Sequence, residues 1–89
     1  SKSDIKRIII GDGVTTIGEF AFNDCSALTS VNILNSVTTI KMQAFSNCSA
    51  LTSVNIPNSV TTIGNYAFYY CIYNHRTTKT NQKYPSVNL

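Results

Sequence analysis

Residues 28–50 read LTSVNILNSVTTIKMQAFSNCSA, and residues 51–73 repeat them as LTSVNIPNSVTTIGNYAFYYCIY. A third copy lies upstream at residues 5–27, IKRIIIGDGVTTIGEFAFNDCSA, where isoleucines take the places of the aliphatic residues that open each later unit. Self-similarity at a fixed period of this size indicates an array of stacked units, and about three units are needed before such a stack is stable. The 23-residue period therefore predicts a solenoid of three coils over residues 5–73.

Each unit begins with a predicted β-strand. In residues 28–33, Val31 and Ile33 alternate with Ser30 and Asn32, and this alternation is typical of a strand that is buried on one side. A single coil cannot bury its own apolar residues, so it must stack on the next coil. We therefore expect a parallel sheet to which every unit contributes one strand, with the polar residues on its solvent side.

The remainder of each unit carries the chain back to the next strand. Residues 37–40, VTTI, follow a turn and predict a second short extended segment. Beyond it, Ile40, Ala44 and Cys48 are spaced by four, which favours one or two helical turns with one buried face. The expected fold class is a β-rich α/β solenoid, with a parallel sheet on one side and short helical turns on the opposite side.

The charged residues are few and unevenly distributed. They make up 12% of the chain, against about 25% in a typical domain. Up to Cys71 the basic and acidic residues cancel, so the net charge of +3 comes from the polar segment 74–89, which carries Arg76, Lys79 and Lys83. Because the repeats carry no basic face, we expect no nucleic-acid partner. No apolar run is long enough to predict a membrane span.

The segment 74–89 is predicted to be a C-terminal tail or a cap. Its polar, basic composition favours a disordered tail. The alternative is an arm that binds phosphate groups or an acidic surface.

The three cysteines, Cys25, Cys48 and Cys71, fall one per unit at the same position. A zinc site needs closely spaced pairs of ligands, and His75 is the only histidine. Stacked parallel side chains also fit the geometry of a disulfide poorly. We therefore expect buried free thiols, and no metal or other cofactor.

No arrangement of residues predicts catalysis. The four carboxylates and the single histidine are scattered, and no nucleophile has a base near it in the sequence. Residues 11–13, Gly-Asp-Gly, lie between two extended segments and predict a turn, since no helix with a Lys-Ser or Lys-Thr pair follows as in a phosphate loop. The chain is therefore not expected to be an enzyme.

The pattern in residues 51–73, L-x-x-V-x-I-P-x-S-V-T-x-I-G-x-x-A-F-x-x-C, resembles the BspA-like class of leucine-rich repeats. The matching residues are Leu51, Val54, Ile56, Pro57, Ser59, Val60, Thr61, Ile63, Gly64, Ala67, Phe68 and Cys71. The resemblance covers residues 5–73 and implies a curved leucine-rich-repeat solenoid with a parallel sheet on its concave face. It also implies a surface-exposed or secreted protein that attaches to other cells, to matrix proteins or to further copies of itself.

The chain departs from the family pattern at three places. Leu34 stands where proline is usual, Lys41 where glycine is usual, and Gly-Asp-Gly at 11–13 where Pro-Asn-Ser is usual. Members of the family generally carry many more repeats, so this chain is either a short member or a piece of a longer one.

Two groups of residues are candidates for partner binding. In repeat solenoids the concave sheet often binds the partner, and its outward residues here are predicted to be Arg7, Ile9, Ser30, Asn32, Ser53 and Asn55. The second group, Tyr66, Tyr69 and Tyr70, occupies positions that vary between the units. Exposed tyrosines are typical of interfaces, but these residues could also cover the end of the stack.

The threonine pairs 15/16, 38/39 and 61/62 form a regular array. They are interpreted as β-branched residues on the outer side of a short strand. The alternative is a flat surface that binds ice or another crystal.

Taken together, the sequence and the resemblance predict a non-catalytic, protein-binding repeat module of a cell-surface or secreted adhesion protein, with a host or matrix protein as its partner. The alternative is a structural scaffold that self-associates by stacking through under-capped solenoid ends.

Overall fold

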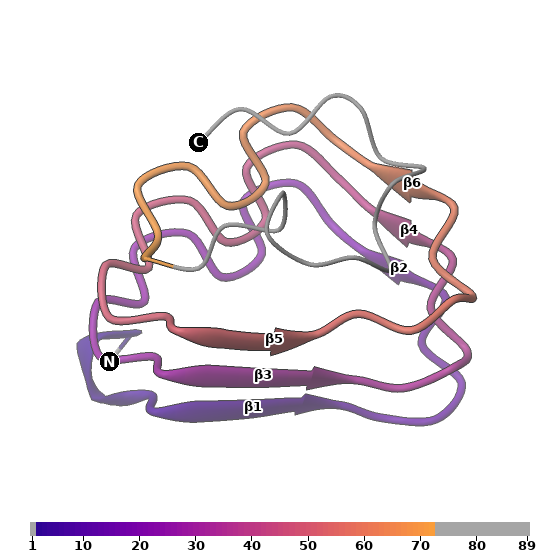
Figure 1. The fold of residues 1–89 in the computed structure, drawn as a ribbon, viewed down its shortest axis with the longest axis horizontal. Helices are drawn as coiled ribbons and strands as arrows, with labels where there is room; N and C mark the ends of the chain where they lie inside the picture. Colours follow the sequence, from indigo (N-terminus) through magenta and orange to yellow (C-terminus); the bar gives the residue numbers. More distant parts are fainter. Residues whose placement is uncertain (1, 73–89) are drawn as a thin grey trace.

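The computed structural model describes residues 2–72, which form three coils stacked on one another (Figure 1). The predicted segment 74–89 and the last residue of the third unit lie outside the described residues. The elements are a short 3-10 helix, η1 (Lys2–Asp4), and six strands, β1 (Arg7–Ile10), β2 (Thr16–Ile17), β3 (Ser30–Ile33), β4 (Thr39–Ile40), β5 (Ser53–Asn55) and β6 (Thr62–Ile63).

The strands form two parallel sheets, one on each of two sides of the stack (Figure 1). The first has the order β1-β3-β5 and the second β2-β4-β6. In both, partners are separated by one repeat, as in Arg7 with Ser30 and Ser30 with Ser53. The predicted leucine-rich-repeat fold with parallel strands in repeating register is confirmed, and the VTTI segments build a second sheet of their own.

The third side of each coil consists of overlapping turns, where the sequence favoured short helical turns. In the first coil, backbone N–H groups bond to the carbonyl three residues earlier, as from Ala21 to Gly18 at 3.2 Å. Phe20 and Asp24 have φ of 58° and 67°, and such left-handed residues interrupt a right-handed helix. The same conformation recurs in the later coils, at Gln43, Asn47, Tyr66 and Tyr70. No α-helix is present among residues 2–72.

These turns form because they leave backbone donors for the neighbouring coil. The N–H groups of Phe20, Phe22 and Asp24 donate to carbonyls of the second coil at 3.2, 2.7 and 2.9 Å. In an α-helix the same N–H groups would bond within their own segment. Ala44 and Cys48 still point inward as their spacing predicts, and both are fully buried.

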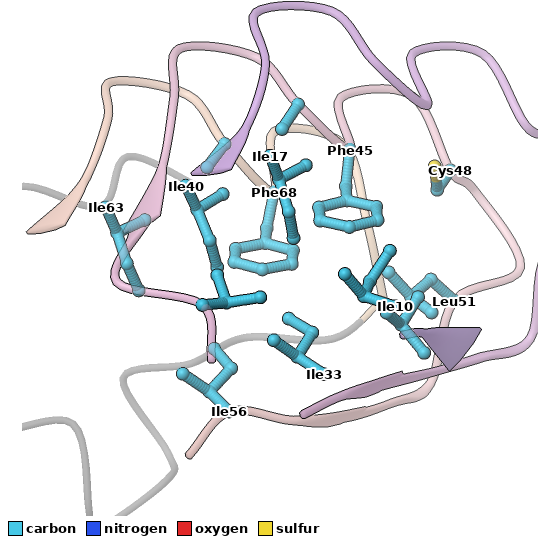
Figure 2. Close-up of a cluster of buried hydrophobic side chains, with 14 of the residues drawn as sticks. Ile10, Ile17, Ile33, Ile40, Phe45, Cys48, Leu51, Ile56, Ile63 and Phe68 are labelled. Atoms are coloured by element: carbon cyan, nitrogen blue, oxygen red, sulfur yellow. The ribbon is translucent and has the colours of Figure 1, made fainter. Parts of the chain in front are cut away.

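Columns of identical side chains fill the interior (Figure 2). Phe45 stacks on Phe22 with a centroid distance of 5.3 Å and on Phe68 at 5.4 Å, and the rings of the second pair are almost parallel. Other core columns are Ile10, Ile33 and Ile56, at or just after the ends of the first sheet's strands, and Ile17, Ile40 and Ile63 from the second sheet. Burial of each large apolar side chain contributes roughly 1.5–3 kcal/mol, so these columns hold the coils together.

The two ends of the stack differ in how far their apolar side chains are covered. Val14 in the first coil is 39% exposed, whereas its counterparts Val37 and Val60 are fully buried. A hollow of about 270 Å³ opens at the first coil, and its apolar lining comes from Ile9, Ile10, Val14, Ile17, Ala21 and Phe22. The first coil therefore presents an open apolar end.

Candidate functional site

The structure brings six of the nine predicted binding residues together on the outer side of the β1-β3-β5 sheet. Along each strand the side chains alternate, so that Val31 and Ile33 are buried while Asn32 points to solvent. The six residues lie in two adjacent columns, Arg7, Ser30 and Ser53 beside Ile9, Asn32 and Asn55. We call these two columns the sheet face. They line a hollow of about 790 Å³ together with Ile8 and Val31.

Elsewhere on the stack, many hydroxyls are bonded to the backbone of the preceding coil. Thr29 donates to the Lys6 carbonyl at 3.1 Å, Ser36 to Val14 at 2.8 Å, and Thr38 to Thr15 at 3.2 Å. These bonds repeat further along the stack and satisfy carbonyls between the coils. The hydroxyls that bond to a neighbouring coil therefore help to hold the stack together.

Among the described residues, the polar side chains of the sheet face do not bond to the backbone of the neighbouring coil. The Nδ2 of Asn55 donates to the Oδ1 of Asn32 at 3.1 Å. Within residues 2–72, the hydroxyls of Ser30 and Ser53 and the guanidinium of Arg7 make no side-chain hydrogen bond or ion pair. The rest of the described chain therefore leaves the hydrogen-bonding capacity of these three side chains unused.

Ile9 interrupts the asparagine column of the sheet face. It occupies the position of Asn32 and Asn55, and its side chain is 71% exposed. An isolated exposed aliphatic residue is ordinary, but this one lines the same hollow as Arg7, Ser30 and Ser53. The sheet face thus combines one aliphatic contact, one cation and several uncharged hydrogen-bonding groups.

The three predicted tyrosines form a separate cluster on the turn side of the third coil. The rings of Tyr66 and Tyr69 meet edge to face at a centroid distance of 4.9 Å, and those of Tyr69 and Tyr70 lie 4.2 Å apart. Tyr66 and Tyr70 are 42% and 67% exposed. The neighbouring Tyr70 hydroxyl raises the pKa of Tyr69. Partner binding by these tyrosines stays a prediction, with capping of the stack as its alternative.

Part of the threonine array is engaged in hydrogen bonds between the coils. Thr16, Thr39 and Thr62 lie in register along the β2-β4-β6 sheet. In the neighbouring column, however, Thr38 and Thr61 donate their hydroxyls to the carbonyls of the preceding coil. This arrangement agrees with the structural interpretation of the threonine pairs.

The cysteines form a column of free thiols behind the turns. The Sγ of Cys48 donates to the Phe22 carbonyl at 3.2 Å, and that of Cys71 to Phe45 at 3.1 Å. Burial raises the pKa of Cys25, and the neighbouring Cys71 thiol together with burial raises the pKa of Cys48. The neighbouring Cys48 lowers the pKa of Cys71, which is only half-buried.

Over residues 2–72, no three His, Cys, Asp or Glu side chains come together in a way that could hold a metal ion. In the same range no helix has the length and apolar character needed to cross a bilayer.

Comparison with known proteins identifies the repeat. A family model described as "BspA type Leucine rich repeat region (6 copies)" matches residues 1–86. A leucine-rich repeat protein of Bacteroides ovatus ATCC 8483, of known crystal structure, is 32% identical over 98% of this chain, with a TM-score of 0.73. Another from Eubacterium ventriosum ATCC 27560 is 26% identical over 79% of the chain, with a TM-score of 0.59.

The chain spans about a quarter of the length of these two proteins, 26% and 24%. No curated protein is similar enough to count as a match. The family match covers nearly the whole chain and agrees with the stacked parallel coils. The chain belongs to the BspA-type leucine-rich repeat family.

Proposed function

We propose that this chain is a non-catalytic protein-binding module and that it forms part of a cell-surface or secreted attachment protein. The observation that carries this proposal is the sheet face, where Arg7, Ser30 and Ser53 make no side-chain hydrogen bond within residues 2–72. Leucine-rich repeat domains generally bind proteins, and the family is typically non-catalytic and commonly surface-associated. A host or matrix protein is therefore the proposed partner.

The test uses a panel of purified extracellular-matrix proteins immobilised on a biosensor. Asn32→Lys adds a long charged side chain to the centre of the sheet face, and we expect it to weaken binding at least tenfold. Asn65→Lys makes the same change at an exposed residue on the turn side and should leave binding unchanged. Absence of binding to every protein of the panel, or equal effects of the two substitutions, would contradict the proposal.

A self-associating scaffold is the second candidate function, and the open apolar end of the first coil favours it. The edge strand β1 reads Arg-Ile-Ile-Ile, and among residues 2–72 it pairs with β3 alone. Unpaired apolar edge strands are sites at which two chains associate. Light scattering should then show a mass that grows with concentration, and Val14→Lys should reduce it. A constant monomer mass would refute the scaffold and leave the binding module untouched.

A further inference from the structure

The hydrogen bond between Asn55 and Asn32 fixes which way the Asn32 amide points on the sheet face. Asn55 donates to the Oδ1 of Asn32, so the Asn32 oxygen is engaged. The oxygen and nitrogen of an amide diverge from the same carbon, so the Asn32 Nδ2 is turned away from Asn55 when the Oδ1 is turned toward it. Ile9 stands next in this column and cannot accept a hydrogen bond. Within residues 2–72 the Asn32 Nδ2 therefore remains an unused donor.

Arg7 adds a second donor at the same end of the sheet face. It pairs in register with Ser30, two residues before Asn32 on β3. Strand geometry places Ser30 and Asn32 about 6.6 Å apart along the strand, with Arg7 about 4.8 Å to the side. Among residues 2–72, Arg7 is the only charged residue that lines the hollow, and its guanidinium makes no ion pair with any of them. A cation and an amide donor thus line the same hollow, and neither is paired with an anion among residues 2–72.

We propose that this end of the sheet face binds the carboxylate of an acidic side chain in an extended segment of the protein partner. The Arg7 guanidinium would bind the two carboxylate oxygens, since its fork of donors matches that planar group. The Asn32 Nδ2 and the Ser30 hydroxyl would donate beside it, and Ile9 would contact the aliphatic part of the ligand. The exposed Ile9 favours a peptide over a sugar, whose hydroxyls would lose hydrogen bonds there. This inference rests on the proposed binding function.

The experiment measures binding of two short peptides to the isotope-labelled chain by NMR titration. Acetyl-Thr-Glu-Thr-amide carries the carboxylate, and acetyl-Thr-Gln-Thr-amide has the same shape without the charge. We expect the Glu peptide to bind about fivefold more tightly at low salt, with shifts of the Asn32 side-chain amide and the Arg7 Nε–H signals. Arg7→Gln should abolish the preference, and Arg7→Lys should restore only part of it. Lys6→Gln removes the same charge at the neighbouring exposed residue, outside the hollow, and should preserve the preference.

The outcomes separate this inference from the function on which it rests. Equal affinity for the two peptides, no saturable shift with either, or an equal effect of Lys6→Gln would overturn the carboxylate site. A preference for glucuronate over the Glu peptide would overturn the peptide partner. If a matrix protein binds in a manner sensitive to Asn32→Lys but not to Arg7→Gln, the binding function stands and the inference fails. If no matrix protein binds, the binding function fails whatever the peptides show.

Discussion

Gly64 lies at the junction of the second and third coils, where the backbones approach each other closely. A Cβ added to Gly64 would lie 2.5 Å from the Met42 nitrogen and 2.8 Å from the Lys41 carbonyl carbon, both of them backbone atoms. Ordinary contacts between carbon atoms are about 3.5–4.0 Å, so Gly64→Ala forces the coils apart by roughly 1 Å. That movement also stretches the 2.7 Å bond from the Gly64 N–H to the Ile40 carbonyl.

The cost of Gly64→Ala follows from these contacts. Overpacking costs about 1–3 kcal/mol, and a lost hydrogen bond adds about 1 kcal/mol. Replacing glycine by alanine returns about 0.4–1 kcal/mol by restricting the unfolded chain, because Gly64 does not have a positive φ. We expect a net loss of about 1–3 kcal/mol in the free energy of unfolding. In a thermal melt, each kcal/mol lowers Tm by roughly 4–8 °C in a domain of this size.

Gly18 provides the matched control. It occupies the same position in the first coil, and a Cβ there would meet nothing within 4 Å. Gly18→Ala should therefore stabilise the chain by about 0.4–1 kcal/mol. Urea denaturation of both variants measures the difference directly. If the two substitutions change the unfolding free energy by the same amount, the proposed contact between the coils is refuted.

Three further predictions follow from the core and the turns. Phe45→Ala removes the ring held between Phe22 and Phe68. In urea denaturation it should lower the free energy of unfolding by about 3–5 kcal/mol. Phe22→Ala should cost less, because Phe22 is only partly buried; equal losses would contradict the stacking. Ser46→Ala should cost about 1 kcal/mol, because the buried Ser46 hydroxyl bonds to Asn23 Oδ1 and the Gln43 carbonyl. Ser49→Ala, at an exposed site, is its control, and an equal loss there would count against the role of Ser46. In the folded chain N-ethylmaleimide should label Cys71 first, because its pKa is lowered and it is half-buried, while Cys25 and Cys48 react only on unfolding. Mass spectrometry of the labelled peptides measures the order, and early labelling of Cys48 would disagree with it.

Much of the fold could be predicted because the repeat supplies its own alignment. The period places Arg7 beside Ser30 and Phe22 beside Phe45, and the structure shows both contacts. The turn side was harder to predict, because a spacing of four is shared by a helical face and by these turns. The turns are favoured over a helix because they let the Phe22 N–H bond to a carbonyl of the next coil. The sequence of a single unit does not show that such a carbonyl is present.

The sheet face could be located from strand alternation, but its chemistry could not be predicted. Ser30 and Thr29 are neighbours of similar polarity, and only the structure shows that the Thr29 hydroxyl is bonded to the backbone. In the same way, the direction of the bond from Asn55 to Asn32 depends on how two side-chain amides turn. No sequence pattern encodes that choice.

The register of the coils limits how the length of such a gene can change. Every coil bonds to its neighbour on three sides with partners about one repeat apart, as in Thr38 with Thr15 and Asn47 with Tyr69. An insertion or deletion of one codon within a coil would shift these sides against one another and turn core residues outward. Duplication of a whole 23-residue unit adds a coil whose every bond already has a counterpart. Recombination between the near-identical segments would therefore lengthen or shorten the protein by whole coils. Related genes would then differ in the number of coils that they encode.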